Sequence, residues 1–166
     1  MREQPSDTDV ARCFNTTFAI SEHVVLVGGA AAPYYMPSPA PHRAVIRYRE
    51  NFAASALHEV AHWCIAGARR RQRPDFGYWY EPPPRDARAL AAFLAVEAPV
   101  QALESLLARA AGLPFRVSLD DLDAEVSGIR EQFNAAVADR ATMWEARGLP
   151  PRAARFVDAL RKGDWQ

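Results

Sequence analysis

The chain has 166 residues, of which 49% are hydrophobic and 24% charged, and this composition predicts one globular domain spanning residues 1–166. Twenty basic and twenty acidic side chains give a formal net charge of zero, so no overall field draws the protein to nucleic acid or to a membrane surface. No apolar run approaches the roughly 20 residues of a bilayer span, the first residues are polar, and two cysteines are too few for a disulfide framework. We therefore expect a cytoplasmic protein.

The first part of the chain predicts one helix and two strands. Apolar residues at helical spacing predict a helix over residues 8–19, with candidate caps at Ser6 and Thr8. Two short runs rich in β-branched residues, 23–27 and 44–48, predict strands. Two glycines and a proline-rich stretch separate these runs, so we expect them to form a small sheet.

The segment from Asn51 to Gly67 is the clearest helix in the sequence. Asn51 is a candidate N-cap and Gly67 a candidate C-terminal stop, and the alanine-rich stretch between them carries regularly placed apolar side chains. The aromatic stretch that follows, residues 75–84, is too interrupted to form a regular element. We expect this stretch to pack against another part of the fold.

Two long helices are predicted in the second half of the chain. Composition favours a helix over residues 85–112, kinked or split at Pro99 because proline removes an amide donor. Ser118 with Asp121 resembles a capping box, and it precedes a helix that runs to about Arg147.

The chain closes with a last predicted helix, whose first turn suits Pro150 and Pro151. The sum of these elements is helix-rich, with a minor sheet that precedes the main helix. We therefore predict an α+β fold, a single domain in which a small sheet comes before a central metal-binding helix. A zincin-like arrangement is compatible with this order of elements.

The predicted helix 51–67 contains the sequence His58-Glu59-Val60-Ala61-His62, an H-E-x-x-H motif. Residues four apart on a helix share one face, so both imidazoles can bind a single metal ion while Glu59 points beside it. A helix that merely displays two solvated histidines is the structural alternative. Because the motif lies inside a helix rather than in a loop, we favour the metal site.

Two imidazoles do not complete a metal site, so a third ligand must come from elsewhere, most naturally a carboxylate. Glu97 is the first candidate, because it lies in a predicted helix between apolar neighbours, and Gln101 one turn later could hydrogen-bond it. Glu104 is the reserve candidate. Other acids lie in or beside the irregular segment, which would place a ligand less rigidly: Asp75, Glu81 and Asp86.

Two histidines and one carboxylate leave the identity of the metal open. Zinc held in this way hydrolyses amides, whereas ferrous iron in a facial triad of the same composition activates dioxygen. In a zinc-dependent peptidase with Glu97 as the distant glutamate ligand, Glu59 would be the general base for a water molecule. In an oxygenase, Glu59 would handle protons near the site. A non-catalytic binding module with a structural metal, or none, is the third hypothesis.

Short segments spread over nearly the whole chain carry a further signal: Cys13-Phe14-Asn15, Ala54–Glu59, His62–Gly67, Asp75–Tyr80, Arg85-Asp86-Ala87, Val96-Glu97, Gln101-Ala102-Leu103 and Arg155-Phe156. Together they resemble the bacterial elongation factor P hydroxylase family. The pairing of His62-Trp63 with the aromatic sequence DFGYWY is far more specific than H-E-x-x-H alone. The stretch from residue 29 to 41 has its own proline-rich form and departs from the family pattern.

The resemblance implies a metal-dependent monooxygenase that hydroxylates the modified lysine of elongation factor P after β-lysine has been attached to it. It implies Fe(II) as the metal, with zinc as an alternative occupant, and molecular oxygen as co-substrate. His58 and His62 match the family's metal-binding histidines, and Glu97 matches the acid expected as third ligand. The implied partner is elongation factor P in its β-lysylated form.

A lysyl-lysine arm is long, flexible and cationic, so its pocket should offer aromatic walls and a carboxylate to pair the charge. The aromatic stretch and its surroundings supply both kinds of side chain: Tyr78, Trp79 and Tyr80 with Asp75, Glu81 or Asp86. The alternative is that these aromatic residues simply cover the helix as part of the core.

Overall fold

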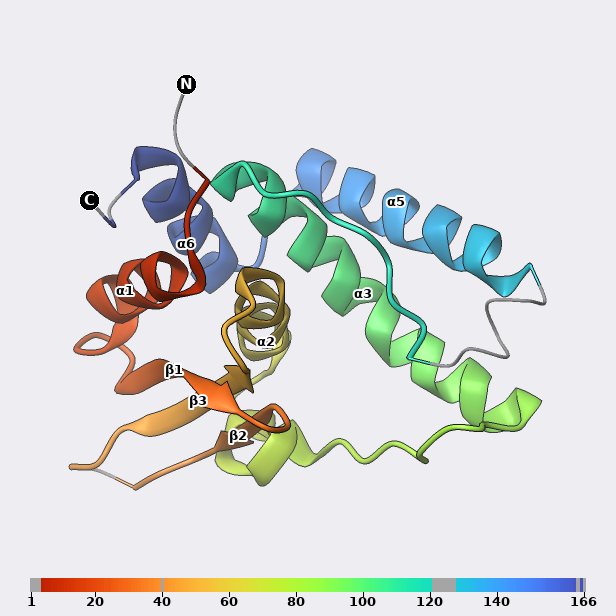
Figure 1. Cartoon of the computed structure of the whole chain (residues 1–166), viewed down its shortest axis with the longest axis horizontal. Coiled ribbons are helices and arrows are strands. Elements are labelled where there is room, and N and C mark those ends of the chain that lie inside the picture. The colour runs from red at the N-terminus through yellow and green to blue at the C-terminus, as the bar shows by residue number, and fades with distance from the viewer. Residues whose placement is uncertain (1–3, 40, 121–127, 164, 166) are drawn as a thin grey trace.

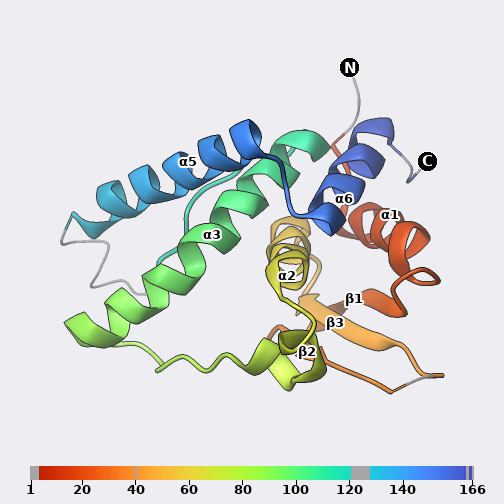
Figure 2. The same cartoon turned by 180° about the vertical axis from the view of Figure 1, so that it is seen from behind.

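The computed structural model describes residues 4–39, 41–120, 128–163 and 165. Helix α2, Ala53–Ile65, lies at the centre, between a small sheet on one side and the long helix α3, Ala87–Ala111, on the other (Figure 1). Helices α1, Asp7–Phe18, and α6, Pro151–Lys162, cover one end of α2, and α5, Ile129–Arg147, runs alongside α3 (Figure 2). The predicted α+β class, with helices predominating, is confirmed.

The sheet has the strand order β1-β3-β2, with β1 at Val24–Ala30, β2 at Tyr34–Met36 and β3 at Ala44–Arg49. Strands β1 and β3 are parallel, and β2 pairs antiparallel with β3. Both predicted strands exist, but the sequence analysis missed β2, which forms within the proline-rich stretch. Gly28 is required in β1, because a Cβ atom there would lie 2.5 Å from the ring of Tyr48.

Of the two candidate caps, Ser6 and not Thr8 begins helix α1, and it forms a capping box with Asp9. The side chain of Ser6 accepts a hydrogen bond from the backbone of Asp9, whose carboxylate accepts one from the backbone of Ser6 in return. The amide side chain of Asn15 then bonds both backbone groups of Leu26, at 2.8 and 3.1 Å, and so fixes the helix against β1. This contact gives Asn15 a structural role.

The ends of α2 differ from the prediction. Asn51 is not the N-cap; Phe52 occupies that position without a side-chain hydrogen bond, and the helix ends at Ile65, before Gly67. At the C-terminal end, the guanidinium group of Arg152 donates to the carbonyls of Trp63, Cys64 and Ala66. A cation from α6 therefore satisfies the free carbonyls that a glycine cap would have covered.

An aromatic cluster packs beneath α2, on the side of the sheet and of α1 and α6. Phe14 lies with its ring centroid 5.3 Å from Trp63 and 5.6 Å from Phe156, both edge to face, and Phe18 lies 4.9 Å from Trp63. All four residues are at most 2% exposed. Buried rings in this geometry contribute beyond their buried area, so the cluster fixes the position of α2.

Helix α3 is continuous through Pro99, so the predicted split does not occur. Burial along the helix on both sides of the proline, at Phe93, Val100 and Leu103, offsets the loss of one backbone hydrogen bond. By length and hydropathy alone α3 could cross a bilayer, but 56% of its most apolar window is buried inside the protein. Its contacts with α2, α5 and α6 are those of a core helix.

After Gly112, which ends α3 in the left-handed conformation as predicted, the chain runs back along α3 in an extended segment. Ser118 lies in this segment and does not begin a helix; its backbone N–H donates to Gln101 of α3 at 2.9 Å. Asp121, the other half of the predicted capping box, lies outside the described residues. The next described helix, α5, has Gly128 at its N-cap and ends at Arg147 as expected.

Candidate metal centre

The two histidines of the H-E-x-x-H motif lie on one face of α2, as residues four apart on a helix must. Their Nε2 atoms are 3.2 Å apart, and the two rings are nearly perpendicular, with centroids 4.8 Å from each other. The side chain of His58 is 26% exposed and that of His62 is 11% exposed. Both rings therefore present a nitrogen to the same small volume at the edge of a cavity.

Glu97 of α3 completes this group. Its carboxylate oxygens lie 3.2 Å from Nε2 of His62 and 3.5 Å from Nε2 of His58, and its side chain is 4% exposed. The three candidate ligand atoms all lie within 4.8 Å of one another, close enough to bind one metal ion. The donor set is two imidazoles and one carboxylate, which suits zinc or ferrous iron.

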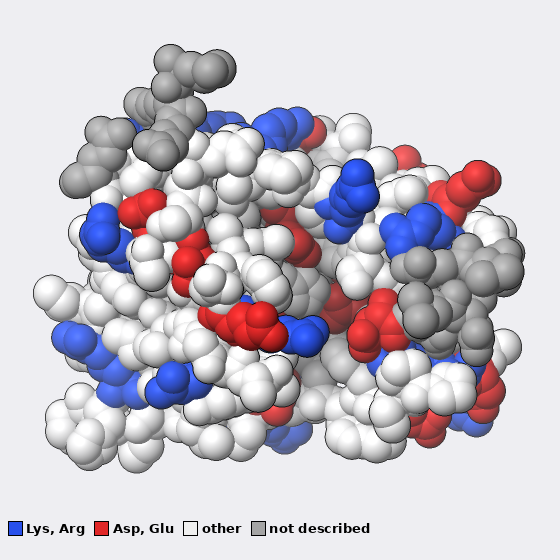
Figure 3. Space-filling model, in the orientation of Figure 1, with Lys and Arg blue, Asp and Glu red and all other residues white. Residues whose placement is uncertain are grey.

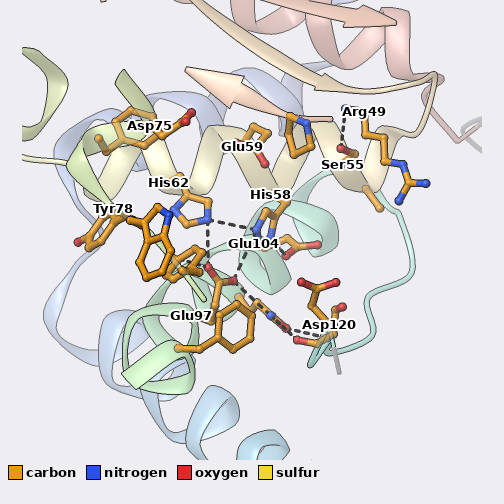
Figure 4. A pocket seen from close by; sticks show the side chains of 18 of the residues that line it. Arg49, Ser55, His58, Glu59, His62, Asp75, Tyr78, Glu97, Glu104 and Asp120 are labelled. Carbon is orange, nitrogen blue, oxygen red and sulfur yellow. Dashed lines mark hydrogen bonds and ion pairs between the residues drawn. The ribbon is translucent and has the colours of Figure 1, made fainter. Parts of the chain in front are cut away.

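Three further side chains hold the candidate ligands in place, and Figure 4 labels one of them, Glu104, beside His58. Glu104 accepts a hydrogen bond from Nδ1 of His58 at 2.8 Å, so Nε2 of this ring remains for the metal. The hydroxyl of Tyr80 donates to Glu97 at 3.1 Å. The amide of Gln101 lies 3.4 Å from Glu97 and donates to the carbonyl of Ser118 at 2.7 Å.

Glu104, the reserve candidate for the third ligand, thus orients His58 and is not a member of the candidate ligand group. Gln101 lies beside Glu97, where its sequence position placed it. The contact of Tyr80 with Glu97 was not foreseen, because Tyr80 was predicted, with Tyr78 and Trp79, to line the substrate pocket. A hydrogen bond between residues on different elements leaves no spacing signal in the sequence.

The charges of the site stabilise one another. Burial alone would lower the pKa of His58, but the hydrogen bond to Glu104 and the negative charges of Glu97, Glu104 and Glu59 outweigh it and raise this pKa to about 10. Burial alone would raise the pKa of Glu97, but the hydrogen bond and positive charge of His62 lower it to about 2. The carboxylate is therefore kept ionised, as a metal ligand must be.

Glu59, the acid within the motif, is 8% exposed and lines the cavity next to the two histidines. Burial raises the pKa of its carboxyl group, and the charges of His62 and His58 only partly oppose this. Among the described residues, no group hydrogen-bonds to the carboxyl group of Glu59. A buried carboxyl group with a raised pKa, free to face the cavity, can take up and release a proton near the site.

The cavity in front of these residues has a volume of about 690 Å³. Asp75, Tyr78, Trp79 and Tyr80 line it, as predicted for a substrate pocket, and Trp79 is 77% exposed at its rim. Figure 3 shows acidic side chains around the hollow in the middle of this face of the molecule. The cavity therefore offers aromatic surface and negative charge together.

The remaining predicted substrate acids lie elsewhere. The carboxylate of Asp86 caps α3 by accepting from the backbone N–H of Ala89 at 2.7 Å, and neither Asp86 nor Glu81 is among the residues that line the cavity. Asp75 lines the cavity, but its Oδ1 accepts from the backbone N–H of Tyr35 at 2.9 Å. Of the three acids proposed for the substrate charge, the structure brings only Asp75 to the pocket.

The other end of the cavity is formed by residues that the sequence analysis did not select: Arg49, Ser55, Arg116, Ser118 and Asp120. They come from the end of β3, the first turn of α2 and the extended segment after α3. Ser55 lies in one of the segments that carry the family resemblance and Ser118 in the predicted capping box, but neither pattern marks them as residues of the cavity. Only the three-dimensional fold brings the five residues beside the histidines.

Two imidazoles and a buried carboxylate that face a cavity, with further side chains bound to His58 and Glu97, are typical of a mononuclear metalloenzyme. Comparison with known proteins identifies a family within this class of enzymes. The family model described as elongation factor P hydroxylase matches residues 13–163. The elongation factor P lysine hydroxylase of Haemophilus influenzae is 39% identical over 154 residues, which are 92% of this chain and 85% of that protein.

The chain therefore belongs to the elongation factor P hydroxylase family. The resemblance seen in the sequence is confirmed. Membership also favours a hydroxylase over the peptidase and the non-catalytic binding module, which the motif alone left open.

Proposed function

We propose that this protein hydroxylates the β-lysylated lysine of elongation factor P. Family membership supports the reaction and the protein substrate. The single structural observation that carries the proposal is the group of His58, His62 and Glu97 at the edge of a cavity with aromatic and acidic walls. We propose that residues 1–166 act as one catalytic domain in the cytoplasm, where translation factors work, without contact to membrane or nucleic acid.

The residues present fit a mononuclear metal ion. His58 and His62 offer Nε2, and Glu97 offers an ionised carboxylate. Glu104 orients the ring of His58 through its hydrogen bond with Nδ1. Ferrous iron held by two histidines and one carboxylate activates dioxygen, so we propose Fe(II) as the metal and molecular oxygen as co-substrate. Zinc fits the same donor set and is the alternative occupant.

The protein's own groups have three tasks in this reaction. Tyr80 and Gln101 hold the carboxylate of Glu97 in one orientation, so that the ligand group is formed before substrate enters. Glu59 holds or releases a proton beside the site, because burial keeps its pKa above that of an ordinary glutamate. Insertion of one oxygen atom from dioxygen, with reduction of the other to water, also consumes two protons and two electrons, the latter from an external reductant.

The cavity fits a long cationic arm. Its volume of about 690 Å³ lies within the range of about 300–1,000 Å³ that is common for ligand pockets. Tyr78 and Trp79 offer aromatic faces for the methylene stem and for an ammonium group, and Asp75 and Glu59 offer negative charge. We propose that these four residues bind the β-lysyl arm. Tyr80 lines the same cavity and also contacts the candidate ligand Glu97.

Intact-mass analysis of elongation factor P tests the proposal. Factor purified from cells that contain this protein should be heavier by one oxygen atom than factor from cells that lack it. Complementation with wild-type protein should restore the mass, and complementation with His62→Ala should not. Factor of the same mass from both cell types would overturn the proposal, and appearance of cleaved factor would support the peptidase instead.

A further inference from the structure

The sequence DFGYWY forms a turn in an uncommon backbone conformation directly beside the candidate metal site. Asp75, Phe76 and Gly77 have φ angles of 48°, 57° and 71°, so three successive residues are left-handed, and two of them carry side chains. This region is unfavourable for residues with a Cβ atom, above all for a bulky one. Such strain persists only where surrounding contacts hold it, and it is concentrated at functional sites.

Contacts from two other elements hold the turn. Asp75 accepts a hydrogen bond from the backbone N–H of Tyr35, on the outer edge of β2, at 2.9 Å. The guanidinium of Arg70 donates to the carbonyl of Phe76 at 3.1 Å, and Arg70 also lies over the ring of Tyr78 at 3.9 Å. The turn is thus tied to the sheet on one side and to the segment after α2 on the other.

The turn places the ring of Phe76 against the metal site. This ring is 3% exposed and lies nearly parallel to Tyr35, at a centroid distance of 4.2 Å and an angle of 11°. It is also nearly parallel to the imidazole of His62, at 6.2 Å and 9°. The strained backbone therefore aligns one buried ring with the plane of a candidate metal ligand.

The two histidines are held in different ways. Nδ1 of His58 is bound by Glu104, which fixes both the ring plane and the tautomer. The polar contacts of His62 with His58 and Glu97 both involve Nε2. In the described part of the chain, no hydrogen-bond partner lies at Nδ1 of His62. Beyond its contacts through Nε2, the ring of His62 is therefore oriented by packing.

From this asymmetry we infer that Phe76 is a positioning residue for His62, and that the left-handed turn anchored by Asp75 exists to deliver its ring. The inference rests on the metal site of the proposed function. Asp75 then has a second role beside its place in the cavity wall, since its carboxylate locks the turn to β2. Phe76 lines the cavity but is not one of the candidate metal ligands.

Four variants test this inference. Phe76→Leu keeps an apolar side chain but removes the ring, and Asp75→Ala keeps the ring but removes the anchor of the turn. Asp75→Asn is the conservative rescue, because its amide oxygen can still accept the hydrogen bond of Tyr35. Phe14→Leu is the matched control, since Phe14 is equally buried and lies in the aromatic cluster beneath α2.

The first readout uses the metal-free protein, with NMR of the histidine side chains. We expect the imidazole signals of His62 to be sharp in wild type, Asp75→Asn and Phe14→Leu, and shifted or broadened in Phe76→Leu and Asp75→Ala, with His58 unchanged. Unchanged His62 signals in both Phe76→Leu and Asp75→Ala would overturn the inference, as would equal changes in Phe14→Leu. Should Phe76→Leu fail to fold, the pair of Asp75 variants decides the question.

The second readout is titration with cobalt(II), whose visible absorption reports the geometry of its ligands. Loss of an outer partner of a metal ligand typically weakens binding by about 10–100-fold. For Phe76→Leu we expect the affinity for cobalt(II) to fall by about tenfold and the absorption spectrum to change. Asp75→Asn and Phe14→Leu should have the affinity and spectrum of wild type. A wild-type protein that binds no cobalt would contradict the proposed metal site, whereas the NMR comparison would still decide the role of Phe76.

Discussion

The two faces of α2 differ in the contacts that hold them, which are apolar on one face and charged on the other. On one face, Trp63 packs edge to face against Phe14 and Phe18, and shape and apolar burial hold the contact. On the other face, His58 and His62 lie among carboxylates, and each buried charge depends on its neighbours. Burial of apolar rings stabilises a fold outright, whereas burial of charged groups is roughly neutral at best. The first face should therefore carry stability and the second function.

The largest expected effect is on the polar face. Glu97→Gln keeps the size of the side chain but removes the charge that a metal ligand needs, so iron content after reconstitution should fall by more than about 100-fold, beyond the loss typical of outer partners. Circular dichroism should still show a folded protein. Glu131→Ala, at an exposed position on α5, is the control and should keep its iron. Iron content near the wild-type value in Glu97→Gln would refute the ligand assignment.

The opposite result is expected on the aromatic face. Phe156→Ala removes a fully buried ring that packs against Phe14 and Phe18, and should lower the free energy of unfolding by about 3–5 kcal/mol. Ile20→Ala, at a position that is 81% exposed, should change it by less than about 0.5 kcal/mol. Urea unfolding measures both. At low temperature the folded fraction of Phe156→Ala should still bind iron with wild-type affinity, and weaker binding would show that the two faces are coupled.

A smaller effect is expected where a partner of a ligand is changed. Glu104→Gln can still accept a hydrogen bond from Nδ1 of His58 but loses the charge that favours it, so metal affinity should fall by about 10-fold while the fold persists. Competition with a chelator of known affinity measures the change. If Glu104→Gln lost as much metal as Glu97→Gln, Glu104 would be a ligand itself.

The smallest effect is expected at the rim of the cavity. Truncation of the exposed Trp79 to alanine should raise the apparent KM for elongation factor P several-fold, because one aromatic wall of the pocket is lost, and should leave iron content unchanged. Kinetic assays on both proteins at equal iron loading separate the two quantities. Parallel losses of substrate affinity and iron would place Trp79 with the metal site instead of the pocket.

The sequence predicted the parts of this fold and site that depend on local patterns. The cap at Ser6, the helical spacing of the motif and the end of α3 at Gly112 are set by neighbours a few residues away, and the structure has all three. The short strand β2 was missed, because it forms only by pairing with β3. Asn51 was wrongly chosen as the N-cap, which is Phe52, and Gly67 as the C-terminal stop, because Arg152 from α6 satisfies the last carbonyls of α2.

In the candidate metal site too, the features set by local sequence were predicted and those set by contacts between elements were not. The spacing of His58 and His62 is local, and the position of Glu97 between apolar neighbours favoured an inward side chain, so the sequence could single out all three. The hydrogen bonds of Glu104 and Tyr80 to these residues join different elements, and no spacing rule predicts them. Asp86 caps α3 and does not line the cavity, and a helix cap and a substrate carboxylate look alike in a sequence.

The most direct test of the proposed hydroxylation is a reaction with isotopically labelled oxygen. Purified protein, loaded with Fe(II) without air, would be mixed with β-lysylated elongation factor P, a chemical reductant and ¹⁸O₂, and the mass of the factor would be measured. We expect a gain of one ¹⁸O atom per factor with wild type and none with His58→Ala. An oxygen atom drawn from water, a cleaved factor or an unchanged mass would contradict this expectation.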